Sequence, residues 1–265
     1  MDLIEKFVKR IPPDRRSNIP FFDSMREVYL NKYNKSSLYD NEIKKLKNSH
    51  QGERCFVIGT GPSLKKTPLE LLKNEIVFGS NTLYKLAESR DFPITYYCVS
   101  DQGVWNTHKE GILKLNTTFF LSGYAGREYI SNFEEYEKLK KEVIVFKDLG
   151  NIRRFGWKIK DVVKGTYWGN SIMVDLCLQL TFFMGFDEVY LLGVDFDYSK
   201  DHHFDGEKFK FQNKTDTYLE KHWERVYKSL EIIKEGYDSE NRKIYNSTVG
   251  GKLDLFERKK LEEIL

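Results

Sequence analysis

The chain has 265 residues, of which 40% are hydrophobic and 31% charged, a composition typical of a soluble globular protein. Its 43 basic and 40 acidic residues leave a net charge of only +3, which argues against a dedicated nucleic-acid binder and restricts anion binding to a local site. This length is enough for one sizeable core and a small appendage.

Residues 1–50 are predicted to form a helical N-terminal appendage. Apolar residues between Leu3 and Ile11 follow a helical spacing that ends at a pair of prolines, and a second helical stretch rich in Lys, Tyr and Leu covers 22–48. We interpret the appendage as a packing arm or as a contact between copies of the chain in a homo-oligomer. Peripheral contact of the basic, amphipathic first helix with a membrane surface is the alternative.

The chain is expected in the reducing cytoplasm. Its three cysteines, Cys55, Cys98 and Cys177, lie inside apolar runs and are predicted to be reduced thiols of the core. Residues 1–13 lack the apolar core of a signal peptide. The longest apolar window, 172–184, is interrupted by polar side chains and is too short to span a bilayer. Any membrane contact would therefore be peripheral, at the inner face.

From Arg54 onward, short strands alternate with helices. The predicted strands cover 55–59, 75–81, 94–101, 117–122, 142–148 and 188–198, and the predicted helices include 63–74 and 169–186. This alternation predicts an α/β fold with a Rossmann-like, mostly parallel sheet and helices on both faces. The strands are apolar without polar alternation, as expected for a sheet covered on both faces. We assign 51–265 to one nucleotide-binding catalytic domain.

Small or polar residues stand where several predicted strands end. Gly59, Asn81, Asp101 and Asp195 each occupy such a position. In open α/β sheets, ligands bind beyond the carboxyl ends of the strands. We therefore expect these residues to outline one ligand site.

The segment GTGPS, from Gly59 to Ser63, links a predicted strand to a helix. Glycines permit close approach of a backbone, and a helix N-terminus offers N–H groups and a positive dipole end to a phosphate. The segment matches neither G-x-G-x-x-G nor a Walker loop, since no Gly-Lys-Ser/Thr follows. By itself it is compatible with a phosphate site and equally with a plain strand-to-helix turn.

Asp195 and Asp197 form a D-x-D pattern at the end of the last predicted strand. Two carboxylates at this spacing could hold Mg²⁺ or Mn²⁺ against a diphosphate. Alternatively, Asp195 ends the strand or binds a ribose hydroxyl.

His202 and His203 follow in a polar loop with aromatic residues. Imidazole has a pKa suited to a general base, which makes both histidines candidates for proton transfer. A plain surface loop is the alternative, and a zinc site lacks a second cluster of ligands. His222, inside a predicted helix, is interpreted as structural.

Several segments together resemble a superfamily of Rossmann-like proteins. They read VIGTGPSL, FGSNTLY, YYCVSD, GNSIMVDLCLQLTFFMGFDEVYLLGVDF and IYNSTVGGKLDLF, and the resemblance covers residues 52–258. The superfamily includes the archaeal 6-hydroxymethylpterin diphosphokinase-like (MptE-like) proteins, the motility accessory factors that glycosylate flagellin, and the Campylobacter-type bacterial sialyltransferases.

The resemblance to the sialyltransferases, whose fold is a variant of GT-A, implies a CMP-sugar site. Thr60 stands where those enzymes have asparagine, and their catalytic histidine lies in the loop where His202 and His203 are the candidates. The implied nucleotide-binding residues are Gly59, Thr60, Gly61, Pro62, Ser63, Asn81, Asp101, Asn170, Ser171, Asp195, Phe196 and Tyr198.

The implied reaction is an inverting, histidine-assisted transfer that requires no cofactor. A CMP-linked, sialic-acid-like sugar would pass to a cell-surface glycan or glycolipid, as in lipopolysaccharide or capsule synthesis. The first alternative is a Mg²⁺-dependent diphosphokinase that uses ATP and a pterin alcohol, with Asp195 and Asp197, or Asp101, as metal ligands. The second is a non-catalytic, nucleotide-binding assembly protein. No nucleic-acid partner is expected.

Overall fold

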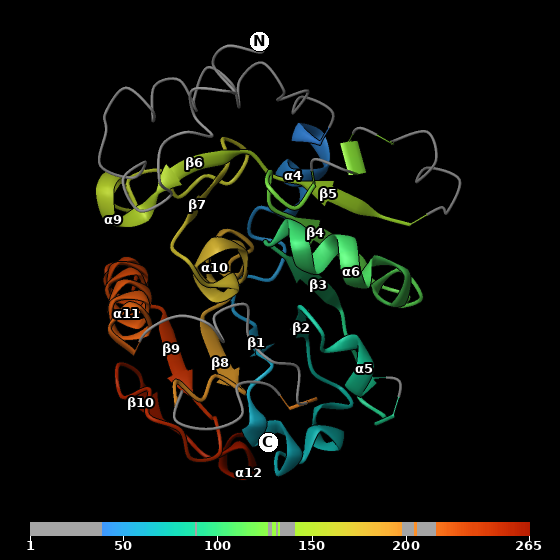
Figure 1. The fold of residues 1–265 in the computed structure, drawn as a ribbon, viewed down its shortest axis with the longest axis vertical. Coiled ribbons are helices and arrows are strands. Elements are labelled where there is room, and N and C mark those ends of the chain that lie inside the picture. Colours follow the sequence, from blue (N-terminus) through green and yellow to red (C-terminus); the bar gives the residue numbers. More distant parts are fainter. Residues whose placement is uncertain are drawn as a thin grey trace.

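The computed structural model describes residues 39–87, 89–126, 129–130, 132, 141–197, 204–205 and 216–265. Within these ranges, strands alternate with helical segments around a central sheet (Figure 1). The strands are β1 (Arg54–Ile58), β2 (Val77–Ser80), β3 (Tyr96–Val99), β4 (Thr118–Leu121), β5 (Val143–Val145), β6 (Asp148–Asn151), β7 (Thr166–Trp168), β8 (Glu188–Leu192), β9 (Lys243–Asn246) and β10 (Glu257–Arg258). The helical segments are α4 (Asp40–Leu46), η2 (Pro62–Lys65), η3 (Leu69–Leu72), α5 (Tyr84–Ala87), α6 (Gln102–Ile112), α9 (Ile152–Phe155), η4 (Met173–Cys177), α10 (Leu178–Phe183), α11 (Asp216–Asp238) and α12 (Leu261–Ile264).

Eight of the described strands form one sheet in the order β10-β9-β8-β1-β2-β3-β4-β5, and every neighbouring pair is parallel. Figure 1 shows β8 and β9 on one side of β1, with β2, β3 and β4 on the other. The predicted Rossmann-like α/β fold is thereby confirmed. Because the chain extends the sheet in both directions from β1, the carboxyl end of β1 lies at a topological switch point, where such sheets bind ligands.

The sheet has a continuous apolar interior. All residues of β2 are buried, as are the last four of β1 and of β8. Parallel strands covered on both faces read as unbroken apolar runs, which is why the sequence pattern located them well. The three cysteines are free and buried, as predicted.

Residues 39–50 contact this core directly. Ile43 of α4 is 3% exposed and belongs to the main hydrophobic cluster. The backbone N–H groups of Asn48 and His50 donate to the carbonyls of Phe183 and Met184, at 3.0 and 2.8 Å. These contacts fix the chain leading into β1 against the end of α10.

The structure differs from the predicted helix at 63–74, where it has two short 3₁₀ segments, η2 and η3. Pro68 explains the break, because proline lacks a backbone N–H and disfavours helical backbone at the residue before it. The structure also adds β6 and β7, which pair in a small second sheet, and β9 and β10 at one edge of the main sheet. These four short strands were not predicted from the sequence.

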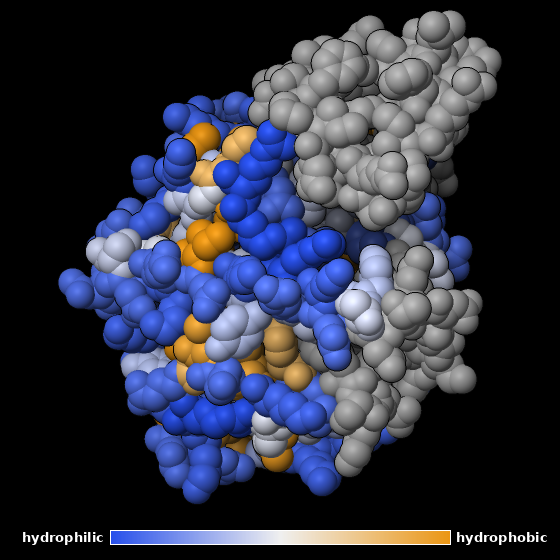
Figure 2. Space-filling model, turned by 60° about the vertical axis from the view of Figure 1, so that its left-hand side comes forward, coloured by the Kyte–Doolittle hydropathy of each residue, from blue (hydrophilic) through white to orange (hydrophobic). Residues whose placement is uncertain are grey.

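Among the described helices, none combines the length and the apolar character that a membrane crossing needs. Figure 2 shows a mostly hydrophilic face, on which hydrophobic residues appear as small separate patches. Residues 1–38 of the predicted appendage lie outside the described residues, so membrane contact and oligomer formation through it stay predictions.

Candidate functional site

A pocket of about 830 Å³ opens at the carboxyl ends of β1, β2, β3 and β8. Ser63 does not line the pocket but hydrogen-bonds to Asp195, which does, whereas Tyr198, His202 and His203 lie outside the described residues. The predicted residues that line the pocket are Gly59, Thr60, Gly61, Pro62, Asn81, Asp101, Asn170, Ser171, Asp195, Phe196 and Asp197. Residues from five separate segments of the sequence are therefore brought to one cavity.

The GTGPS loop is held against the end of β8 by alternate amides. The N–H of Gly59 donates to the carbonyl of Leu192, and the N–H of Gly61 donates to that of Gly193, each at 2.8 Å. A side chain at Gly61 would collide with the carboxylate of Asp195 and lie 2.6 Å from the Gly193 carbonyl oxygen. The glycines therefore allow the backbone of the loop to lie close to the backbone that follows β8. The N–H groups of Gly59 and Gly61 bond to that backbone and do not point into the pocket.

Asp195 accepts two hydrogen bonds from Ser63 at the start of η2. The Ser63 amide donates to Oδ1 at 3.1 Å, and its hydroxyl donates to Oδ2 at 2.7 Å. Burial raises the pKa of Asp195, and the two Ser63 bonds offset part of that rise. Since helix N-termini attract anions, the Asp195 carboxylate is stabilised at the start of η2.

Both carboxylates of the D-x-D pair already have side-chain or backbone partners in this arrangement. Both oxygens of Asp195 accept bonds from Ser63, and Asp197 forms an ion pair with Lys252 at 2.9 Å. The described His, Cys, Asp and Glu side chains form no group of three or more that could hold a metal ion.

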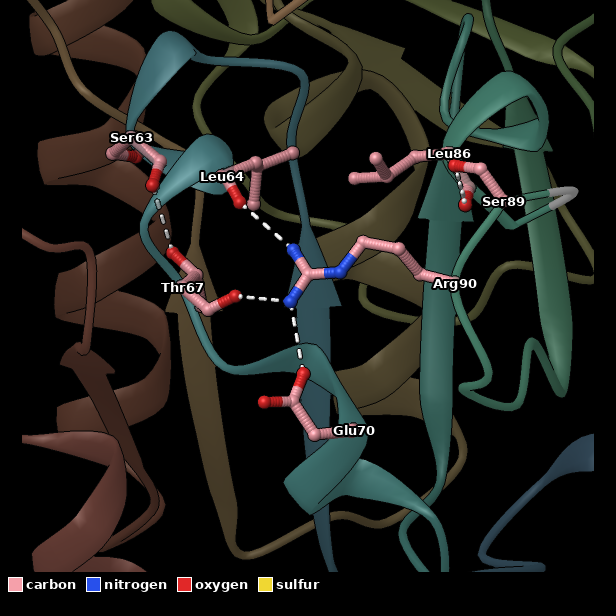
Figure 3. Close-up of polar contacts among 7 residues, drawn as sticks. All are labelled: Ser63, Leu64, Thr67, Glu70, Leu86, Ser89 and Arg90. Carbon is pink, nitrogen blue, oxygen red and sulfur yellow. Dashed lines mark hydrogen bonds and ion pairs between the residues drawn. The ribbon is translucent and has the colours of Figure 1, made fainter.

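Arg90 fixes the segment that follows the glycine loop (Figure 3). Its guanidinium donates to the carbonyls of Leu64 and Thr67, at 3.1 and 2.9 Å, and to Glu70 at 2.9 Å. The hydroxyl of Thr67 donates to the carbonyl of Ser63 at 3.1 Å. One cation thus stabilises the backbone that presents Ser63 to the pocket wall.

The ends of β2 and β3 supply the next wall. Asn81 adopts a left-handed backbone (φ 51°), and its carbonyl accepts a 2.6 Å hydrogen bond from the hydroxyl of Tyr97. Asp101 caps α6 by accepting the N–H of Val104 at 3.0 Å. Because Val104 also lines the pocket, the positive N-terminal end of α6 faces the cavity.

Arg153 of α9 positions the opposite wall. Its Nη1 lies 3.0 Å from Oδ1 of Asn170, 3.1 Å from the carbonyl of Arg225 and 3.1 Å from Oγ of Ser229. Asn170 has a left-handed backbone (φ 71°), which asparagine tolerates better than most residues. The guanidinium therefore ties this pocket residue to α11.

Replacing Arg153 with methionine tests this positioning. We expect a loss of stability of about 1–3 kcal/mol, because the buried hydroxyl of Ser229 loses a charged donor, and a weaker affinity for any ligand that contacts Asn170. Thermal unfolding and calorimetric titration with CMP would measure both effects. The matched control is Arg154→Met, at the neighbouring residue, whose side chain is exposed. Equal effects of the two variants would contradict the role of Arg153.

Further side chains that the sequence did not single out as site residues also line the pocket, among them Asp148, Asp175 and Trp223, together with His222, which was interpreted as structural. Burial raises the pKa of Asp175 to about 7, while burial and two nearby arginines lower the pKa of His222 to about 4. An aspartate inside an otherwise apolar helix was the available signal for Asp175. The sequence around His222 gave no such signal, because His222 reaches the pocket only through the tertiary packing of α11.

Four aromatic side chains, here named the aromatic rim, line the pocket: Tyr124, Trp168, Phe196 and Trp223. Phe196 adopts a left-handed backbone (φ 53°), which is unusual for a bulky residue, and its ring meets that of Trp223 edge to face at 5.7 Å. Tyr124, 43% exposed, and Trp168 also line the cavity. This rim suits contact with the flat face of a heterocycle or a sugar ring.

The fold and the pocket define a Rossmann-like α/β protein with a ligand site beyond the carboxyl ends of its strands. Residues 29–201 match the model of the family described as 6-hydroxymethylpterin diphosphokinase MptE-like. The chain belongs to this MptE-like family, whose description names a transferase activity. The match includes β1 to β8 and ends before α11, which contributes His222 and Trp223. No curated protein matches the chain.

Proposed function

We propose that the chain is a glycosyltransferase that uses a nucleotide-activated sugar, CMP-linked and sialic-acid-like, to modify a hydroxyl of a cell-surface glycan. One observation carries the proposal. The strand-end pocket brings most of the predicted nucleotide-binding residues together with two titratable groups, the half-buried Asp175 and the buried His222. Such a site could hold an activated donor and also take a proton from an acceptor.

The proposed reaction transfers the sugar in one displacement. The acceptor hydroxyl loses its proton, and its oxygen forms a bond to the anomeric carbon of the sugar. The bond from that carbon to the phosphate oxygen breaks, and its electron pair leaves with CMP. Positive helix ends stabilise the departing phosphate, and two of them, at α6 and at the start of η4, face the pocket through Val104 and Met173.

The aromatic rim would receive the acceptor. Trp168, Phe196 and Trp223 offer ring faces and edges to a sugar, and the exposed Tyr124 extends the rim outward. Assignment of the proton acceptor to His202 or His203 remains a prediction, since both residues lie outside the described ranges.

A second candidate is transfer of diphosphate from ATP to an alcohol of the pterin type, favoured by the family match. Both reactions leave a nucleoside monophosphate in the site, AMP in one case and CMP in the other. Diphosphate transfer ordinarily depends on Mg²⁺, which neutralises charge on the phosphates. We favour the metal-independent reaction because Asp195 is bonded to Ser63 and Asp197 is paired with Lys252.

Thermal-shift measurements with CMP, CDP, UDP, GDP and ATP, each with and without Mg²⁺, test the proposal. A ligand that binds only the folded protein raises the unfolding temperature. We expect stabilisation by CMP without metal. Stabilisation only by ATP with Mg²⁺ would support the diphosphokinase, and no shift with any nucleotide would contradict both transferases. Binding without any turnover would indicate a non-catalytic assembly protein.

A further inference from the structure

Asp175 is an acidic residue in the middle of an apolar helical turn. It lies in η4, a π-helical turn between β7 and α10, and it lines the pocket. The other residues of this turn, Met173, Val174, Leu176 and Cys177, are all buried hydrophobics. π-Helical turns are rare and occur frequently at functional sites.

The carboxylate of Asp175 is anchored on one side. Its Oδ1 accepts the N–H of Gly169 at 2.6 Å, and the hydroxyl of Ser100 and the amide of Ser171 also hydrogen-bond to the carboxylate. Gly169 and Ser171 flank Asn170, a predicted nucleotide-binding residue. Asp175 is therefore fixed beside the position where a donor would lie.

Gln179 fixes the turn itself. Its amide donates to the carbonyls of Val174 and Tyr167, at 2.6 and 2.7 Å, and accepts the N–H of Tyr167 at 3.0 Å. The side chain is completely buried. These three hydrogen bonds of Gln179 hold η4 at a fixed distance from β7, so Asp175 is positioned without a bound ligand.

Charged groups reach this region from several neighbouring elements. Asp148 of β6 interacts unfavourably with Asp175, while Arg153 of α9 interacts favourably with it. Arg225 and His222, both on α11, lie close to Arg153. Burial is the main cause that raises the pKa of Asp175 to about 7, and Asp148 adds to the rise. A carboxylate with this pKa is a much stronger base than the imidazole of His222, whose pKa is lowered to about 4.

We infer that Asp175 accepts the proton of the acceptor hydroxyl during transfer. The inference rests on the proposed transfer to a hydroxyl, and it holds for either donor. As the acceptor oxygen bonds to the transferred group, its proton moves to a carboxylate oxygen of Asp175. The nucleoside monophosphate leaves with the electron pair of the broken bond, and Asp175 then releases the proton to solvent.

Asp175→Asn tests the inference, since asparagine keeps the shape of the side chain and can still accept the N–H of Gly169. Initial rates of nucleoside monophosphate release would be measured from pH 5 to pH 9, with CMP-sialic acid plus a short glycan or with ATP plus 6-hydroxymethylpterin. The rate of the unmodified protein should rise through about pH 7, where Asp175 loses its proton, and then flatten. Asp175→Asn should lose this rise and should lower the plateau rate on the order of 10²–10⁴-fold.

Asp148→Asn serves as the matched variant. It removes the negative charge that adds to the raised pKa of Asp175, so the rise should persist and move to lower pH. A rise that persists in Asp175→Asn would overturn the inference. The inference would also be overturned if the rise were retained in Asp175→Asn but abolished by His222→Gln, or by His202→Ala combined with His203→Ala. Absence of turnover in the unmodified protein with both donors would instead refute the proposed function on which the inference depends.

A stability measurement checks the titration without turnover. The carboxyl of Asp175 has a higher pKa in the folded chain than its ordinary value of 3.8, so the folded state binds more protons between pH 4 and 7. The contribution of Asp175 to stability should fall as pH rises through this window, while the lowered pKa of His222 gives the opposite trend in both the unmodified protein and Asp175→Asn. As the pH rises from 4 to 7, the unfolding temperature of Asp175→Asn should therefore increase relative to that of the unmodified protein. A difference between the two temperatures that stays constant with pH would count against the inference.

Discussion

Gly61→Ala should abolish nucleotide binding and destabilise the chain by about 1–3 kcal/mol, the range typical of added atoms in a packed site. The new methyl group would collide with the carboxylate of Asp195 and crowd the carbonyl of Gly193. Either the glycine loop or the end of β8 must then move, and both form the pocket wall. Thermal unfolding and calorimetric titration with CMP would measure the two effects.

Pro62→Ala is the control for this variant. It changes the adjacent residue of the same loop, which also lines the pocket, but removes atoms instead of adding them. We expect it to retain CMP binding with a loss of stability of less than about 1 kcal/mol. If Gly61→Ala bound CMP as well as Pro62→Ala does, the loop would not be part of the nucleotide site.

Gln179→Leu is expected to cost at least about 3 kcal/mol of stability. Leucine has a similar size but leaves the N–H and carbonyl of Tyr167 and the carbonyl of Val174 without their buried partner. Each unsatisfied buried group costs about 1–3 kcal/mol. A fall of about 6–12 °C in the unfolding temperature should follow for a chain of this size.

Gln51→Leu supplies the comparison, because Gln51 is exposed. It should change stability by no more than about 0.5 kcal/mol. Similar unfolding temperatures for the Gln51 and Gln179 variants would show that the hydrogen bonds of Gln179 between β7 and η4 contribute little to stability. The position of Asp175 would then have to be fixed by other contacts.

The strands of the main sheet were predictable because their signal is local. Each of β1, β2, β3, β4 and β8 is an apolar run bounded by polar or small residues, and burial on both faces produces such runs. The strands β6, β7, β9 and β10 are short and mixed in polarity. Their pairing depends on partners far away in the sequence, so no local pattern indicated them.

The candidate site was partly predictable for the same reason. Strand-end residues such as Asn81 and Asp101 reach one pocket because the carboxyl ends of parallel strands share one edge of the sheet. The position of the GTGPS loop followed from this rule, but its contacts did not. Its bonds to Gly193 and Asp195 are long-range, so no local pattern in the sequence indicated them.

The central claim is that the pocket releases a nucleoside monophosphate while a hydroxyl acceptor is modified. ³¹P NMR would test it directly, with CMP-sialic acid and short glycan acceptors in one sample and ATP, Mg²⁺ and 6-hydroxymethylpterin in another. The proposed function predicts release of CMP in the first sample, without added metal and dependent on the acceptor. Release of AMP in the second sample alone would contradict glycosyl transfer and identify a diphosphokinase.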